Sequence, residues 1–286
     1  MQRARKMKMS PDAFLAWKNK AITLLGMSGV GKTTLANCLP KSSWFHYSAD
    51  YRIGTRYMGE AIIDNAKKEA MKVRFLRDLL CSDSIYIGSN ITVDNLEPLS
   101  SFLGKVGDRS KGGLSYDEFV ARQRLHREGE IGALGDVRTF IAKAKDIYGY
   151  DHFINDAGGS ACEINHEETI RSLADHTLIL YIRAERDMED ELIRRQKESP
   201  KPLYYQEGFF AESLAEYFEE HGIDSTETMD PDHFTRWIFP RLVEHRRPLY
   251  RSIADNYGYT LSASDAGRVR SEEEFLDLVA ETVGRS

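Results

Sequence analysis

Residues 26–33 constrain this chain more than any other segment, because they define a ligand as well as a local structure. They read Gly-Met-Ser-Gly-Val-Gly-Lys-Thr, a complete G-x-x-x-x-G-K-[ST] phosphate-binding loop. The apolar run 21–25 before the loop is typical of a buried parallel strand, and residues 33–39 read as a helix that ends at Pro40. The order of strand, loop and helix predicts a nucleotide-binding P-loop.

The chemistry of such a loop assigns roles to its residues. Backbone N–H groups surround the phosphate oxygens, and the glycines allow the close approach that this requires. Lys32 is expected to reach the β- and γ-phosphates, and the Thr33 hydroxyl to hold Mg²⁺. The predicted nucleotide-binding residues are Gly26, Ser28, Gly29, Val30, Gly31, Lys32, Thr33 and Thr34.

Strand and helix patterns alternate along most of the 286 residues. Residues 44–48, 151–156 and 177–182 read as further strands, and residues 56–80, 136–148 and 170–174 as helices. Asp136 is the expected N-cap of its helix, and residues 84–88 are expected to form a short strand or a buried turn. This order predicts an α/β, three-layer P-loop NTPase fold with a mainly parallel sheet, whose ligands bind at the carboxyl ends of the strands.

We expect a single domain over residues 1–286, with inserted helical segments. Residues 88–135 are the least regular part and are rich in glycine, including Gly129, Gly132 and Gly135; we interpret them as an insert that covers a substrate. Residues from about 183 to 235 follow a strand and carry several cations, which is typical of a lid that closes over transferring phosphate.

Polar and charged residues follow the predicted strands where a phosphoryl-transfer enzyme needs them. Asp50 comes just after the second strand, where a carboxylate can face a substrate hydroxyl. Asp156 ends a later strand and can reach a Mg²⁺ shell. Arg194, Arg195 and Lys201 lie in the predicted lid, although charged helix residues of this kind are as often solvated as catalytic.

Together these segments resemble the shikimate kinase family, within the nucleoside-monophosphate-kinase-like P-loop kinases. The shared motifs are D-x-x-I-x-x-R at Asp50, Ile53 and Arg56; the glycine-rich strand end Ala157-Gly158-Gly159; the lid motif Lys201-Pro202-Leu203-Tyr204; and R-x-P-L-Y-x-x-x-A at Arg246, Pro248, Leu249, Tyr250 and Ala254. Ser48 stands where the family has a first acid, and Lys201 stands where it has arginine. Residues 88–135 and about 204–240 have no counterpart in a compact shikimate kinase.

The resemblance implies an ATP-dependent enzyme that uses Mg²⁺ and transfers the γ-phosphoryl group to a hydroxyl of a small anionic metabolite. The implied catalytic residues are Lys32, Asp50, Arg194, Arg195 and Lys201; the substrate-binding residues Asp50, Arg56, Gly158, Gly159 and Arg246; and the metal-binding residues Thr33 and Asp156. The alternative is a nucleotide-gated ATPase or regulatory module that acts on a protein or nucleic-acid partner, which the large inserts and Ser48 favour.

Composition restricts the remaining function classes. The formal net charge of −6 argues against a protein that coats nucleic acid, and no segment approaches the roughly 20 apolar residues of a membrane span. The basic residues 1–9 are not followed by the apolar stretch of a secretory signal. Cys38, Cys81 and Cys162 are isolated and odd in number, so we expect a reducing, cytoplasmic location.

Overall fold

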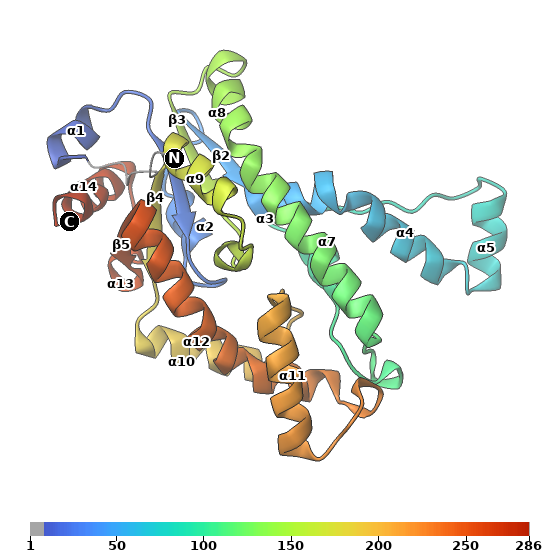
Figure 1. Ribbon diagram of the computed structural model, residues 1–286. Helices are drawn as coiled ribbons and strands as arrows, with labels where there is room; N and C mark the ends of the chain where they lie inside the picture. The colour runs from blue at the N-terminus through green and yellow to red at the C-terminus, as the bar shows by residue number, and fades with distance from the viewer. Residues whose placement is uncertain (1–8, 286) are drawn as a thin grey trace.

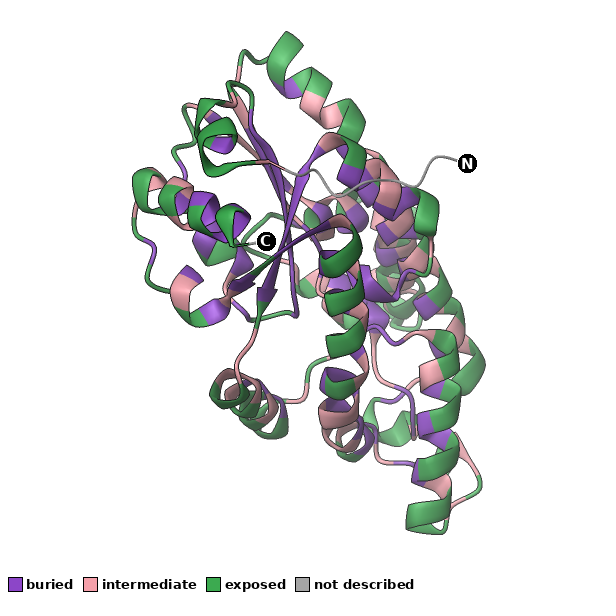
Figure 2. Ribbon diagram, turned by 60° about the vertical axis from the view of Figure 1, so that its left-hand side comes forward, coloured by how far each residue is buried: buried purple, intermediate pink, exposed green. Residues whose placement is uncertain are grey.

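The computed structural model describes residues 9–285, so most of the basic N-terminal segment lies outside the described residues. Its strands form one all-parallel sheet in the order β2-β3-β1-β4-β5. They are β1 (Ala21–Leu25), β2 (Trp44–Ser48), β3 (His152–Asp156), β4 (Leu178–Arg183) and β5 (Gly258–Ser262). All of β1 is buried, because helices cover both faces of the sheet (Figure 2).

Helices connect the strands and build most of the remaining molecule (Figure 1). The α-helices are α1 (Pro11–Ala16), α2 (Lys32–Ala36), α3 (Ala49–Arg52), α4 (Gly59–Ala70), α5 (Arg74–Cys81), α6 (Glu97–Leu103), α7 (Tyr116–Gly135), α8 (Val137–Asp146), α9 (Glu167–His176), α10 (Arg186–Glu198), α11 (Glu207–His221), α12 (Pro231–Tyr257), α13 (Ala263–Ala266) and α14 (Glu272–Gly284). Shorter turns are the π-helix η1 (Ile53–Tyr57) and the 3₁₀-helices η2 (Arg109–Lys111), η3 (Ala161–Glu163) and η4 (Thr226–Thr228). No helix within residues 9–285 is long and apolar enough to cross a membrane.

The predicted strands 21–25 and 44–48 match β1 and β2, and the predictions at 151–156 and 177–182 match β3 and β4 to within one residue at either end. The prediction at 84–88 was wrong, since these residues form no strand and Tyr86 is 92% exposed. Strand β5 was not predicted. It pairs with the outer edge of β4 and buries only alternate apolar side chains, Tyr259 and Leu261.

The expectation that residues 88–135 are irregular was wrong for their second half, which forms the long helix α7. Two of its glycines, Gly129 and Gly132, serve close packing rather than turns. A Cβ on Gly132 would lie 2.5 Å from Cε1 of Tyr57, and a Cβ on Gly129 would lie 3.2 Å from Cβ of the same tyrosine. The absence of side chains on this face therefore lets η1 lie directly against α7.

Asp136 stands between α7 and α8 and is the N-cap residue of α8, as predicted, but its side chain makes no capping hydrogen bond. Because α7 continues to Gly135, the carboxylate instead accepts hydrogen bonds from Arg52 Nε at 2.8 Å and from the Tyr57 hydroxyl at 2.9 Å. These bonds hold the end of α3 and η1 against α7, and so fix the backbone that follows Asp50.

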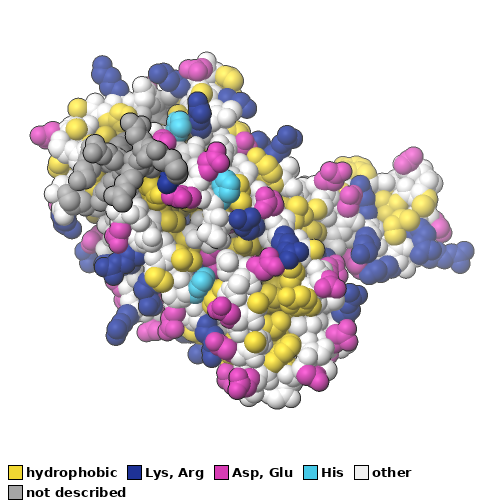
Figure 3. Space-filling model, in the orientation of Figure 1, with side chains coloured by type: hydrophobic (Ala, Val, Ile, Leu, Met, Phe, Trp, Pro, Cys, Tyr) yellow, Lys and Arg dark blue, Asp and Glu magenta, His cyan; other side chains and the backbone are white. Residues whose placement is uncertain are grey.

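Outside the sheet, α4 and α5 extend from the body as an arm (Figure 1). Val73 and Phe75 on this arm are 52% and 69% exposed, and lysine and arginine side chains lie among the apolar ones (Figure 3). Residues 183–235, the predicted lid, contain α10 and α11 joined by an extended segment. Their movement as a lid stays a prediction.

The packing of η1 on α7 leads to a first prediction. Replacing Gly132 with alanine should lower the free energy of unfolding by about 1–3 kcal/mol, because the new methyl group overlaps the Tyr57 ring. Urea denaturation measures the change. Gly135→Ala is the matched control, since a Cβ there meets no atom within 4 Å, and we expect it to be neutral or slightly stabilising. Equal effects of the two substitutions would contradict this packing role.

Candidate active site

The phosphate loop connects β1 to α2 and depends on glycine backbone angles. Gly26, Gly29 and Gly31 have φ values of 148°, 88° and 95°, a region that other residues adopt only with strain. A Cβ on Gly26 would lie 2.8 Å from the carbonyl oxygen of Ile182 on β4. The loop therefore needs glycine both for its curvature and for its position over the sheet.

Lys32 is buried and folds back over the loop. Its Nζ donates to the carbonyl oxygens of Gly26 at 2.7 Å and Met27 at 3.1 Å. Burial lowers the pKa of Lys32, while the nearby carboxylates of Asp156 and Asp50 raise it. An ammonium group held only by two carbonyl oxygens can exchange them for the stronger attraction of phosphate oxygens.

The two residues predicted to hold Mg²⁺ lie in direct contact. The Thr33 hydroxyl donates to Oδ2 of Asp156 at 2.5 Å. Asp156 ends β3 and pairs in register with Leu24 on β1 and with Ser48 on β2, so the sheet itself brings this carboxylate to the loop. Two oxygen ligands, one a carboxylate, are the donors that Mg²⁺ prefers.

Asp50 lies between the phosphate loop and a larger cleft. It belongs to the short helix α3, whose first turn is capped by the Ser48 hydroxyl, which accepts from Tyr51 N–H. Burial raises the pKa of Asp50 to about 6; Lys32 lowers this pKa and Asp156 raises it. The carboxylate is therefore ionised at neutral pH but close enough to its pKa to exchange a proton.

The larger cleft has a volume of about 580 Å³ and opens beside the loop. Residues from the loop, the insert, the lid region and α12 line it, which brings together several predicted site residues: Ser28, Gly29, Asp50, Gly159, Arg195, Lys201 and Arg246. Arg194 does not line the cleft and binds Glu191 and Glu198 of its own helix. Arg195, whose side chain is 63% exposed, also pairs with Glu191, through Nε at 2.6 Å. Arg56 is exposed on η1 and is not among the residues that line this cleft. The roles given to all these residues stay predictions.

Hydrogen bonds within the protein hold the Arg246 side chain in place. Its guanidinium is 3% exposed and pairs with Glu163, which is fully buried, through Nε at 2.8 Å and Nη2 at 2.5 Å. Further N–H groups donate to the carbonyl oxygens of Gly159 and Tyr204, each at 2.8 Å. One of the five N–H groups of arginine is left for a ligand, so most of this side chain fixes the walls of the cleft.

Two buried glutamates of the site could not be recognised in the sequence. Glu130 lies on α7, inside the segment expected to be irregular, and Glu163 lies in η3. Oε2 of Glu130 accepts from the Ser160 hydroxyl at 2.7 Å, whereas its Oε1 has no hydrogen-bond partner. Burial is the largest of the effects that raise the pKa of Glu130 to about 8; the charge of Asp50 acts in the same direction, and the hydrogen bond from Ser160 opposes it.

The carboxyl groups of Glu130 and Asp50 both lie next to Gly158. A Cβ on this glycine would lie 2.6 Å from Oε1 of Glu130 and 2.8 Å from Oδ1 of Asp50. The two carboxyl groups therefore share one small space beneath the glycine-rich turn after β3. Because their pKa values differ, Glu130 keeps its proton at pH 7 while Asp50 is ionised.

The buried position of Glu130 leads to a pH-dependent prediction. Its pKa is about 8 in the folded protein and 4.5 ordinarily, so the folded state binds more protons than the unfolded state between these values. The free energy of unfolding should therefore fall by up to about 1.4 kcal/mol per pH unit as the pH rises through this range. Glu130→Gln should remove this contribution.

Urea denaturation between pH 5 and 9 tests the prediction. The stability of Glu130→Gln relative to the unsubstituted protein should increase with pH and level off above about pH 8. The control is Glu128→Gln on the same helix, whose side chain is 67% exposed. A difference in stability that is independent of pH would contradict the burial of an ionisable Glu130.

Comparison with known proteins gives a likeness in structure only. No protein-family model and no curated protein matches the chain. A shikimate kinase from Bacteroides thetaiotaomicron is 13% identical, with a TM-score of 0.41 over 92% of this chain and 97% of that one. A shikimate kinase from Acinetobacter baumannii, solved with shikimate, is 14% identical, with a TM-score of 0.42 over 96% and 98%. The predicted α/β fold with a parallel sheet is confirmed by the strand order itself, and the phosphate loop lies between β1 and α2 of this sheet.

Proposed function

We propose that this chain is an ATP-dependent kinase that transfers the γ-phosphoryl group to a hydroxyl of a small, anionic metabolite. The observation that carries the proposal is the contact between the Thr33 hydroxyl and the Asp156 carboxylate at the phosphate loop, with Asp50 beside it at the entrance of the cleft. Lys201 and Arg195 in the wall of that cleft suit an acceptor with a negative charge.

The proposed reaction transfers the γ-phosphoryl group of ATP to the acceptor hydroxyl. The acceptor oxygen forms a bond to the γ-phosphorus, the bond from this phosphorus to the β–γ bridging oxygen breaks, and the hydroxyl proton passes to Asp50. The products are ADP and a phosphate monoester. Asp50 also orients the hydroxyl, and proximity of this kind supplies much of the rate enhancement in such transfers.

The other residues act through charge. Lys32 releases its bonds to the loop carbonyl groups and neutralises charge that spreads over the phosphoryl oxygens. Thr33 and Asp156 hold Mg²⁺, which when bound neutralises phosphate charge and orients the phosphates. Lys201 and Arg195 lie on the side of the cleft formed by the predicted lid, where closure would bring them toward the phosphate and exclude water.

The direct test is phosphoryl transfer by the purified protein with Mg²⁺ and ATP, against hydroxylated acids, sugars and nucleosides that include shikimate. A stoichiometric phosphorylated product from one acceptor supports the kinase. Slow hydrolysis of ATP that no small acceptor accelerates would overturn it in favour of the nucleotide-gated ATPase.

Substitution of the loop lysine should separate catalysis from folding. Lys32→Ala should lower kcat at least about a hundredfold, because charge stabilisation in the transition state is lost. It should not lower the thermal stability, since burial of this ammonium group is unfavourable. Initial-rate kinetics and thermal unfolding check both points. Lys67→Ala on α4 is the control, and turnover retained by Lys32→Ala would remove the loop assignment.

The metal site gives a prediction on magnesium dependence. Asp156→Asn should raise the Mg²⁺ concentration needed for half-maximal turnover by about tenfold or more, because a neutral amide is a weaker ligand than a carboxylate. Titration of the initial rate with Mg²⁺ measures this shift. Asp151→Asn, at the other end of β3 and exposed, is the matched control. An unchanged Mg²⁺ requirement in Asp156→Asn would contradict the assignment.

A further inference from the structure

Three leucines at the inserted helix α6 supply apolar surface to the 580 Å³ cleft, beside Glu97 and Ser100 of the same helix, which also line it. Leu96, Leu99 and Leu103 line the cleft, at positions i, i+3 and i+7, which lie on one face of a helix. Phe239 of α12 also lines the cleft. Apolar side chains around a cleft are typical of ligand sites, in which a few polar groups fix the orientation.

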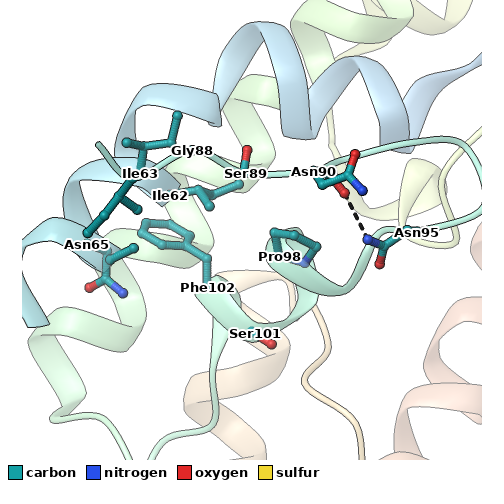
Figure 4. A pocket seen from close by; sticks show the side chains of 12 residues that line it. Ile62, Ile63, Asn65, Gly88, Ser89, Asn90, Asn95, Pro98, Ser101 and Phe102 are labelled. Carbon is teal, nitrogen blue, oxygen red and sulfur yellow. Dashed lines mark hydrogen bonds between the residues drawn. The ribbon is translucent and has the colours of Figure 1, made fainter. Parts of the chain in front are cut away.

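The opposite side of α6 faces a second cavity. Pro98, Ser101 and Phe102 line a separate cavity of about 360 Å³, together with Ile62 of α4 (Figure 4). In the same view Asn95 donates to the Asn90 carbonyl oxygen at 2.8 Å and closes the turn that leads into α6. The Arg122 guanidinium of α7 lies 4.5 Å from the Phe102 ring centroid, so this side of α6 contacts α7 while the leucines line the main cleft.

The polar part of the cleft contains a buried group that lacks a partner. His126 of α7 lines the cleft and is 5% exposed, and its Nδ1 has no hydrogen-bond partner. Its ring stacks on Tyr204 with centroids 5.1 Å apart. Burial lowers the pKa of His126 to about 4, so the ring is neutral and its free nitrogen can bond a hydroxyl. Asp50 and Ser160 line the same cleft.

We infer that the anionic acceptor of the proposed reaction is an amphipathic alcohol, with a hydroxylated head between Asp50 and His126 and an apolar group against the leucine face of α6. This inference rests on the proposed phosphoryl transfer. It follows from the continuity of the apolar wall with Asp50 in one cleft, and from a volume within the range of drug-sized ligands. The insert thereby determines which alcohol reaches the phosphate loop.

The experiment uses N-phenyl-1-naphthylamine, whose fluorescence rises in apolar sites, and the full chain. The dye should bind with micromolar affinity, and Leu96→Ser and Leu99→Ala should each weaken binding at least fivefold. Leu96 is half-buried, so its replacement leaves the fold intact even where Leu99→Ala does not. Phe75→Ser on the α4–α5 arm is the control, because Phe75 is exposed but remote from the lining residues.

A second arm displaces the dye with methyl, butyl and hexyl β-D-glucosides, which share one hydroxylated head. The concentration for half displacement should fall about two- to fourfold for each added methylene. Displacement that does not increase with chain length, or dye binding that depends on Phe75 and not on the leucines, would overturn the inference. Chain-length-dependent displacement without phosphorylation of any alcohol would support the apolar site and refute the kinase, so the two failures are distinguishable.

Discussion

The geometry of the candidate site depends on one buried ion pair, between Arg246 of α12 and Glu163 of η3. Two charges removed from water are stable only when each has a partner, and loss of either one leaves the other uncompensated. The same guanidinium binds the carbonyl oxygens of Gly159 and Tyr204, so a single side chain joins α12, the turn after β3 and the base of the predicted lid. The Tyr250 hydroxyl reinforces this by donating to Gly159 at 2.9 Å.

A fixed turn after β3 explains how two carboxyl groups are kept close but in different states. Gly158 leaves no side chain between Glu130 and Asp50, so their separation depends on where this turn is held. Glu130 is deeper and bonded to Ser160, while Asp50 faces Lys32 and the cleft. Burial raises both pKa values, to about 8 for Glu130 and to about 6 for Asp50, so the two neighbouring carboxyl groups differ in their affinity for a proton.

The sequence predicts the structural elements that are determined by residues close together in the chain. Strands β1 and β2 and the phosphate loop follow from short apolar runs and glycine spacing. Strand β5 depends on the free edge of β4, and the need for glycine at position 132 depends on the Tyr57 ring, both distant in the chain. Glu130 carries no local signal, because only its place beneath Gly158 distinguishes it from the solvated Glu128 two residues earlier.

Different segments of the chain supply the two sides of the cleft. In the proposed reaction, Lys32, Asp50 and Asp156 at the carboxyl edge of the sheet would act on the phosphates and on the acceptor hydroxyl. The leucine face of α6 and His126 of α7 come from the insert and contact whatever fills the rest of the cleft. Because Asp136, at the end of α7, accepts hydrogen bonds from Arg52 of α3 and Tyr57 of η1, the helix that carries His126 is tied to the backbone that follows Asp50. In the proposed function, the residues for specificity and for catalysis thus lie in separate segments that pack together through α7.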